Sequence, residues 1–181
     1  MLTIAVLGVC VLGVAGVASA SAQQFHASKT GTLTGKATNT QVFNTGSGAV
    51  ECTKAFSSGT VTAVLALTQL VTVQYTGCTA FGFINTEITP AQYIFNADNG
   101  EVKIENTITI TPAGAGCKVT VGPQSLKTVK FKNNANKLVE ESAVKGIVST
   151  STGGLCGSSG SSGTYTGNNE IELIGGTISW S

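Results

Sequence analysis

Most of this chain alternates apolar and polar residues with a period of two, and this pattern constrains its fold more than any other feature. Thr, Val and Ile dominate the alternating segments, which are separated by clusters of Gly, Asn, Ser and Pro. Successive side chains of a strand point to opposite faces, so a period of two predicts strands with one apolar face. We expect a single all-β domain, an antiparallel β-sandwich or barrel-like fold of the jelly-roll or Greek-key type.

Three early segments carry this pattern clearly enough to place strands. Residues 31–37 and 41–44 predict one strand each, and residues 59–75 predict two strands or one long, bent strand. A helix over residues 63–70 is the alternative, because so short an apolar run fits either structure. Thr and Val dominate the flanks of this run, which favours a strand.

A hairpin and a loop are predicted further along the chain. Asp98-Asn99-Gly100 has the composition of a hairpin turn, with Tyr93 and Phe95 on one face of the strand before it. Between residues 149 and 163 the composition changes to Ser, Gly and Thr almost exclusively. A segment of this kind lacks the apolar side chains that build a core, so we expect a flexible loop there.

The first 22 residues form an almost unbroken apolar run that ends in small residues. This run predicts a secretory signal peptide over residues 1–22, with A-x-A cleavage sites ending at Ala20 or Ala22. An uncleaved anchor is the alternative, because the run approaches the roughly 18 to 20 residues that cross a bilayer. We expect cleavage, a secreted or cell-surface domain over residues 23–181, and no stable membrane insertion afterwards.

Four cysteines remain once Cys10 has left with the predicted signal peptide, and an even number in an exported chain predicts two disulfides. Four cysteines allow three connectivities. We expect Cys52 to pair with Cys78 and Cys117 with Cys156, because neighbours along a β-meander tend to be neighbours in space. A zinc site is not favoured, since the chain has no C-x-x-C pair and its one histidine is His26. No metal or cofactor is expected.

The charge of the chain argues against nucleic acid and anionic lipid as partners. Charged residues make up 10% of the sequence and the formal net charge is +1, so no basic patch of the required size is expected. The chain also has no arginine, the side chain best suited to bidentate recognition of phosphate.

Catalytic motifs are sparse. His26 would have to serve any Ser-His or Cys-His mechanism, yet it lies a few residues beyond the predicted cleavage site. Ser142-Ala-Val-Lys145 matches S-x-x-K, but residues three apart in a strand point to opposite faces. The acidic residues are expected on solvated surface instead of in a glycosidase-like pair. They are Glu51, Glu87, Asp98, Glu101, Glu105, Glu140, Glu141, Glu170 and Glu172. No catalytic residue is assigned.

Aromatic side chains are the candidates for ligand binding, because they could form a face for sugars or peptides. The candidates are Phe81, Phe83, Tyr93, Phe95 and Trp180. In a β domain such rings more often belong to the core, so burial is the favoured interpretation and ligand binding the alternative. An open groove lined by these rings beside a carboxylate would favour a sugar ligand.

Four segments, in this order, carry a resemblance: Glu-Cys-Thr-Lys at 51–54, Tyr-Thr-Gly-Cys-Thr-Ala-Phe-Gly at 75–82, Cys-Lys-Val-Thr-Val-Gly-Pro-Gln-Ser-Leu at 117–126, and Val-Lys-Gly-Ile at 144–147. Together they resemble a group of small secreted, cysteine-containing, β-rich proteins of soil actinobacteria. The resemblance implies a secreted or cell-envelope β domain and no catalytic residue.

These observations predict an exported, non-enzymatic β domain with a structural, cell-surface or ligand-binding role. A carbohydrate-binding or carbohydrate-active jelly roll is the alternative. The partners expected are a cell-wall or extracellular glycan or a protein, and no nucleic acid.

Overall fold

In the computed structural model, every element in the described part of the chain is a β-strand, which confirms the predicted all-β class. The residues described are 22–45, 48–154, 156–157 and 159–181. The strands are β1 (Phe25–Ala27), β2 (Gly31–Ala37), β3 (Gln41–Thr45), β4 (Gly48–Val61), β5 (Leu65–Ala66), β6 (Thr68–Ala80), β7 (Ile84–Ile88), β8 (Ala91–Asn96), β9 (Val102–Ile104), β10 (Ile108–Pro112), β11 (Lys118–Val121), β12 (Gln124–Leu126), β13 (Val129–Asn134), β14 (Lys137–Thr152), β15 (Gly160–Leu173) and β16 (Ile178–Trp180).

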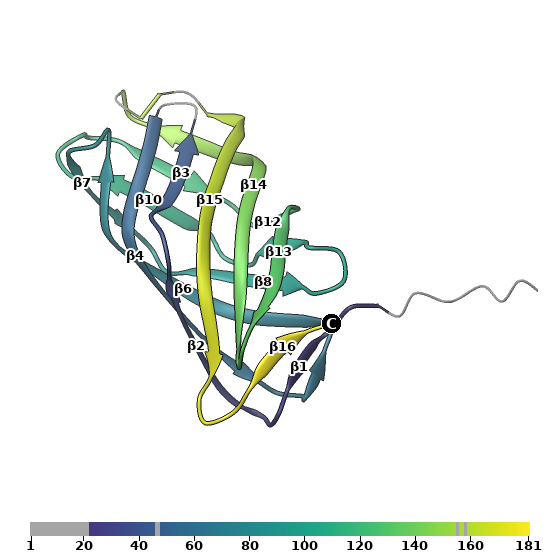
Figure 1. The fold of residues 1–181 in the computed structure, drawn as a ribbon. Coiled ribbons are helices and arrows are strands. Elements are labelled where there is room, and N and C mark those ends of the chain that lie inside the picture. Colours follow the sequence, from purple (N-terminus) through teal and green to yellow (C-terminus); the bar gives the residue numbers. More distant parts are fainter. Residues whose placement is uncertain (1–21, 46–47, 155, 158) are drawn as a thin grey trace, which may run out of the picture.

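The main sheet closes on itself. Its strands follow the order β6, β7, β10, β11, β14, β15, β2 and β4, and β4 pairs back with β6. Every one of these pairings is antiparallel. Strand β3 continues the path of β2, because it also lies between β15 and β4. Of the two predicted architectures, sandwich and barrel-like, this ring of strands is the barrel-like one. Figure 1 shows the two longest neighbours in the ring, β14 and β15, side by side.

The remaining strands pair with strands of the ring or with one another. Strands β8, β9 and β12 branch from β6, and β13 pairs with β14. A separate sheet of order β16, β1 and β5 lies at the end of the fold where Figure 1 marks the C-terminus. Here Gln24 and Ser181 exchange two backbone hydrogen bonds, of 2.7 and 3.1 Å.

The buried alternation of the long strands β4 and β6 shifts at paired positions, and this shift decides which side chains enter the core. Along β6 the buried residues are Val71, Val73 and Tyr75, and then Cys78 and Ala80, so the alternation shifts by one residue at Gly77. Gly77 has a φ of 62°, a conformation in which residues with a side chain are strained. The shift turns Cys78 inward, opposite the buried Cys52 of β4.

Both predicted disulfides form. Cys52 bonds to Cys78 across the directly paired strands β4 and β6, with Cα atoms 3.9 Å apart. Cys117 bonds to Cys156, with Cα atoms 5.6 Å apart, beside the paired strands β11 and β14. The disulfides are typical of proteins that fold in an oxidising environment.

The predicted strands and turns are confirmed where the prediction depends on a few neighbouring residues. Strand β2 occupies the predicted residues 31–37, and the Asp98-Asn99-Gly100 turn joins β8 to β9 in an antiparallel hairpin. Residues 59–75 contain the end of β4, the short β5 and the start of β6, so the alternative helix over 63–70 does not form.

The loop predicted over the Ser/Gly-rich segment 149–163 is shorter in the structure. Strand β14 continues to Thr152 and β15 starts at Gly160, so the connection between them is residues 153–159. Pairing with partner strands holds polar segments in register even where they have few apolar side chains to bury. The predicted signal peptide lies outside the described residues, apart from Ala22.

Candidate functional site

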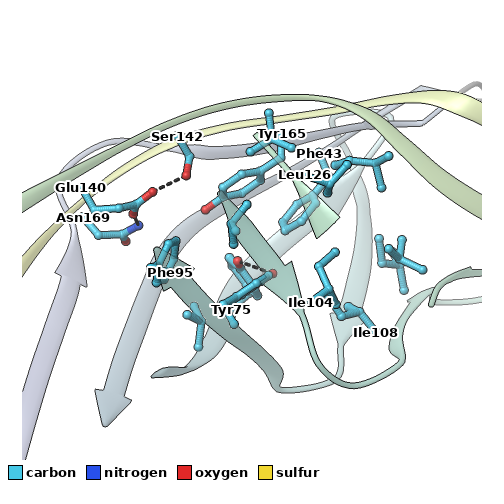
Figure 2. Close-up of a pocket in the computed structure, with 17 residues that line it drawn as sticks. Phe43, Tyr75, Phe95, Ile104, Ile108, Leu126, Glu140, Ser142, Tyr165 and Asn169 are labelled. Atoms are coloured by element: carbon cyan, nitrogen blue, oxygen red, sulfur yellow. Dashed lines mark hydrogen bonds between the residues drawn. The ribbon is translucent and has the colours of Figure 1, made fainter. Parts of the chain in front are cut away.

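A cavity of about 50 Å³ lies inside the fold and is the best-defined candidate site. The side chains that line it come from the ring and from the branch β8, β9 and β12, and Figure 2 draws 17 of them. Its apolar lining consists of Phe43, Val73, Phe95, Val102, Ile104, Ile108, Ile110, Val121, Leu126, Val144 and Ile147. Its polar lining consists of Tyr75, Tyr93, Glu140, Ser142, Tyr165 and Asn169. The cavity therefore has mainly apolar walls with a small set of hydrogen-bonding groups.

Glu140 is the only acid in this lining, and its side chain is buried, with 2% of its surface exposed. Ser142 Oγ donates a hydrogen bond to Glu140 Oε1. Asn169 Nδ2 donates a second, of 2.5 Å, to Glu140 Oε2 from the position directly opposite on β15. Figure 2 shows the three side chains together at one side of the cavity. Both carboxyl oxygens therefore have a partner, as a buried polar group requires.

Burial raises the pKa of the Glu140 carboxyl. The hydrogen bonds from Ser142 and Asn169 lower this pKa, and the nearby Glu141 raises it, but desolvation is the largest effect. The folded protein therefore binds a proton at Glu140 more tightly than the unfolded chain does.

This pKa shift predicts how stability depends on pH. As pH rises from the ordinary glutamate value of 4.5 through the raised pKa of Glu140, the free energy of unfolding of the wild type should fall relative to that of Glu140→Gln. The difference should grow by at most about 1.4 kcal/mol per pH unit in this window and then level off. Urea denaturation of both proteins at several pH values measures it. Parallel stability curves for the two proteins would contradict a raised pKa at Glu140.

Tyrosine hydroxyls form the second polar group of the interior. The hydroxyls of Tyr75 and Tyr93 are hydrogen-bonded at 3.0 Å, and the Tyr165 hydroxyl donates to Gln41 Oε1. Phe43 packs between two of these rings, with centroids 4.6 Å from Tyr165 and 5.0 Å from Tyr75. Burial raises the pKa of all three phenols well above the ordinary range. They therefore act as neutral donors and acceptors.

Gln41 is completely buried, and a glycine makes room for it. A Cβ atom on Gly167 would collide with the Gln41 side-chain amide. The Gln41 amide nitrogen donates to the backbone carbonyl of Asn39 at 2.9 Å. This anchoring holds Oε1 of Gln41 in place to accept the hydrogen bond from Tyr165.

The five aromatic residues that the sequence nominated do not share one surface. Tyr93 and Phe95 line the cavity. Trp180 is partly buried, and its indole nitrogen donates to the carbonyl of Ala97 at 2.8 Å. Phe81 and Phe83 lie at the turn after β6, with 42% and 78% of their surface exposed. Ligand binding by any of these rings stays a prediction.

The expectation that the acidic residues lie on solvated surface is wrong for Glu140. In β14 the residues Leu138, Glu140, Ser142 and Val144 share one face, and all four are buried. The period-two pattern places Glu140 and Ser142 between two apolar residues, and this was the available indication of an interior polar pair. By the same alternation Lys145 is exposed while Ser142 is buried, so the S-x-x-K match does not bring the two together.

Within the described residues, no cluster of three or more His, Cys, Asp or Glu side chains has the arrangement to hold a metal ion. The same part of the chain contains no helix that is long and apolar enough to span a membrane. Comparison of the chain with protein-family models, with curated proteins and with solved structures finds no match.

Proposed function

We propose that this protein is an exported, non-enzymatic binding protein that holds a small, uncharged, mainly apolar molecule in the interior cavity. The observation that carries the proposal is the composition of the cavity lining, with apolar walls and a few hydrogen-bonding groups, which is typical of small-molecule sites. Burying a charged ligand among these mainly apolar walls would be costly, so an uncharged ligand is favoured.

The volume of the cavity limits the ligand. About 50 Å³ exceeds the roughly 10 to 15 Å³ that a cavity needs to hold one water molecule, yet it is far below the about 300 Å³ of a typical drug-sized site. The proposed ligand therefore has only a few non-hydrogen atoms, or is a longer molecule that inserts one end. A hydroxyl or carbonyl on it would meet Ser142, Glu140 or the tyrosine hydroxyls.

Two features support export and a role without catalysis. The apolar segment 1–22 and the two disulfides fit a protein that folds outside the cytoplasm. The cavity lining offers one carboxyl group, whereas glycoside hydrolysis uses two. The proposal includes neither a nucleic-acid partner nor stable membrane insertion.

The test uses xenon and 1-propanol as probes and methyl NMR as the measurement. In the wild type, both probes should shift the methyl signals of Ile104 and Ile108. Val144→Ile adds one methylene to the buried wall and should abolish these shifts. Val148→Ile makes the same change on the same strand, where 52% of the side chain is exposed, and should behave like the wild type. Absence of shifts in the wild type, or equal shifts in Val144→Ile, would refute the proposal.

Ser142→Ala tests the contribution of the polar groups of the cavity separately from that of its apolar walls. It should weaken binding of 1-propanol several-fold and leave xenon binding unchanged, because xenon needs only the apolar contacts. A folded variant that loses both probes equally would contradict a specific role for the polar group.

A further inference from the structure

A second hollow lies on the outer surface, over β15, β2 and β4, and none of the sequence motifs points to it. Its volume is about 230 Å³, and it is lined by Thr34, Gly35, Lys36, Phe56, Glu170 and Glu172. The strands that carry these residues are neighbours in the ring (Figure 1). The hollow therefore rests on a paired sheet, so its lining is held in fixed register.

Phe56 is the aromatic residue of this hollow, and 52% of its surface is exposed. It lies in register with Lys36 of β2, which in turn lies opposite Glu170 of β15. Thr34 and Glu172 form the neighbouring pair. The exposed ring thus has ammonium, hydroxyl and carboxylate groups on one side, carried by β2 and β15.

The charges around the hollow are balanced. Lys137 Nζ lies 2.8 Å from Glu170 Oε1 and 3.1 Å from Glu172 Oε2. Asn134 Nδ2 also donates to Glu170, at 3.4 Å. With Lys36 on the other side, two lysines face two glutamates. The ion pairs hold the carboxylates in place and leave the site without net charge, although their oxygens still have acceptor capacity.

We propose that this hollow binds one sugar residue of a neutral polysaccharide, with the C–H face of the sugar ring stacked on Phe56. The sugar hydroxyls would bond to Lys36, Glu170 and Glu172. A sugar presents an apolar face and a rim of hydroxyls, and this hollow offers the complement of both. Protein interfaces have cores depleted of charged residues, so a surface with one ring among four charges fits a saccharide better than a protein partner.

Affinity gel electrophoresis with laminarin, xylan, mannan and heparin tests the proposal. At least one neutral polysaccharide should retard the wild-type protein. Phe56→Ala should weaken that binding by about tenfold or more, and Phe56→Trp should retain it, because an indole offers an equal or larger stacking face. Phe83→Ala removes a ring that is more exposed than Phe56, at the turn after β6, and should bind like the wild type.

Three results would overturn the proposal: no retardation by any neutral polysaccharide, retardation by heparin alone, or equal retardation of Phe56→Ala and the wild type. Loss of binding in Phe83→Ala but not in Phe56→Ala would move the sugar site to the turn after β6. Urea denaturation of Phe56→Ala establishes that the variant is folded. Val144→Ile should bind polysaccharide normally, so this proposal and that of the interior cavity fail independently.

Discussion

Replacing Cys52 and Cys78 together by alanine is expected to lower the free energy of unfolding by about 3.5 kcal/mol. The disulfide closes a loop with a sequence separation of 26, and this closure restricts the unfolded chain. The loop also contains Gly77 with its positive φ, so the crosslink joins β4 and β6 where their alternation shifts. Urea denaturation of the oxidised wild type and of the double variant measures the difference.

The second disulfide provides the comparison. Cys117 and Cys156 have a sequence separation of 39, so removing this pair should cost slightly more, about 4 kcal/mol. Both pairs are buried, and alanine leaves a similar small gap at each. A loss below about 1 kcal/mol for either pair would contradict stabilisation through the unfolded chain.

Ile110→Ala is expected to lower the free energy of unfolding by about 3 kcal/mol and to enlarge the interior cavity. Ile110 is 1% exposed and lines the cavity from β10, so its truncation removes buried methyl groups beside existing empty space. The enlarged cavity should bind benzene, which the wild-type cavity is too small to hold. Urea denaturation and methyl NMR with benzene measure the two effects.

Ile174→Ala is the matched control, because 51% of this isoleucine is exposed. The control should change stability by less than about 0.5 kcal/mol and should not bind benzene. If Ile110→Ala were as stable as the wild type, or failed to bind benzene while folded, the interior of the ring would not be packed around the cavity as described.

The strands, turns and disulfides that depend on nearby residues could be predicted from the sequence. The strand over residues 31–37 and the hairpin at Asp98-Asn99-Gly100 depend on alternation and turn chemistry within a few residues. The disulfide pairing followed because bonded cysteines lie in or beside adjacent strands. Closure of the ring could not be predicted, since alternation identifies the buried face of a strand and not the partner strand.

The candidate sites were harder to predict than the strands. Glu140 lies in an apolar pattern, but an acidic residue beside Glu141 looks like solvated surface until its partner Asn169 on β15 is known. Phe56 was missed for the opposite reason, because a single aromatic residue in a strand is more often core. Its exposure depends on the shifted alternation of β4, which lies opposite Gly77 of β6.

The pairing of β1 with β16 has a mechanical consequence. Gln24 and Ser181 are hydrogen-bonded, and β1 pairs antiparallel with β16, from Phe25 opposite Trp180 to Ala27 opposite Ile178. Force applied between Gln24 and Ser181 would therefore open the pair one hydrogen bond at a time, like a zipper, instead of shearing all its bonds at once. Under such a load the small sheet of β16, β1 and β5 would yield first, while the ring that holds both sites would still be closed.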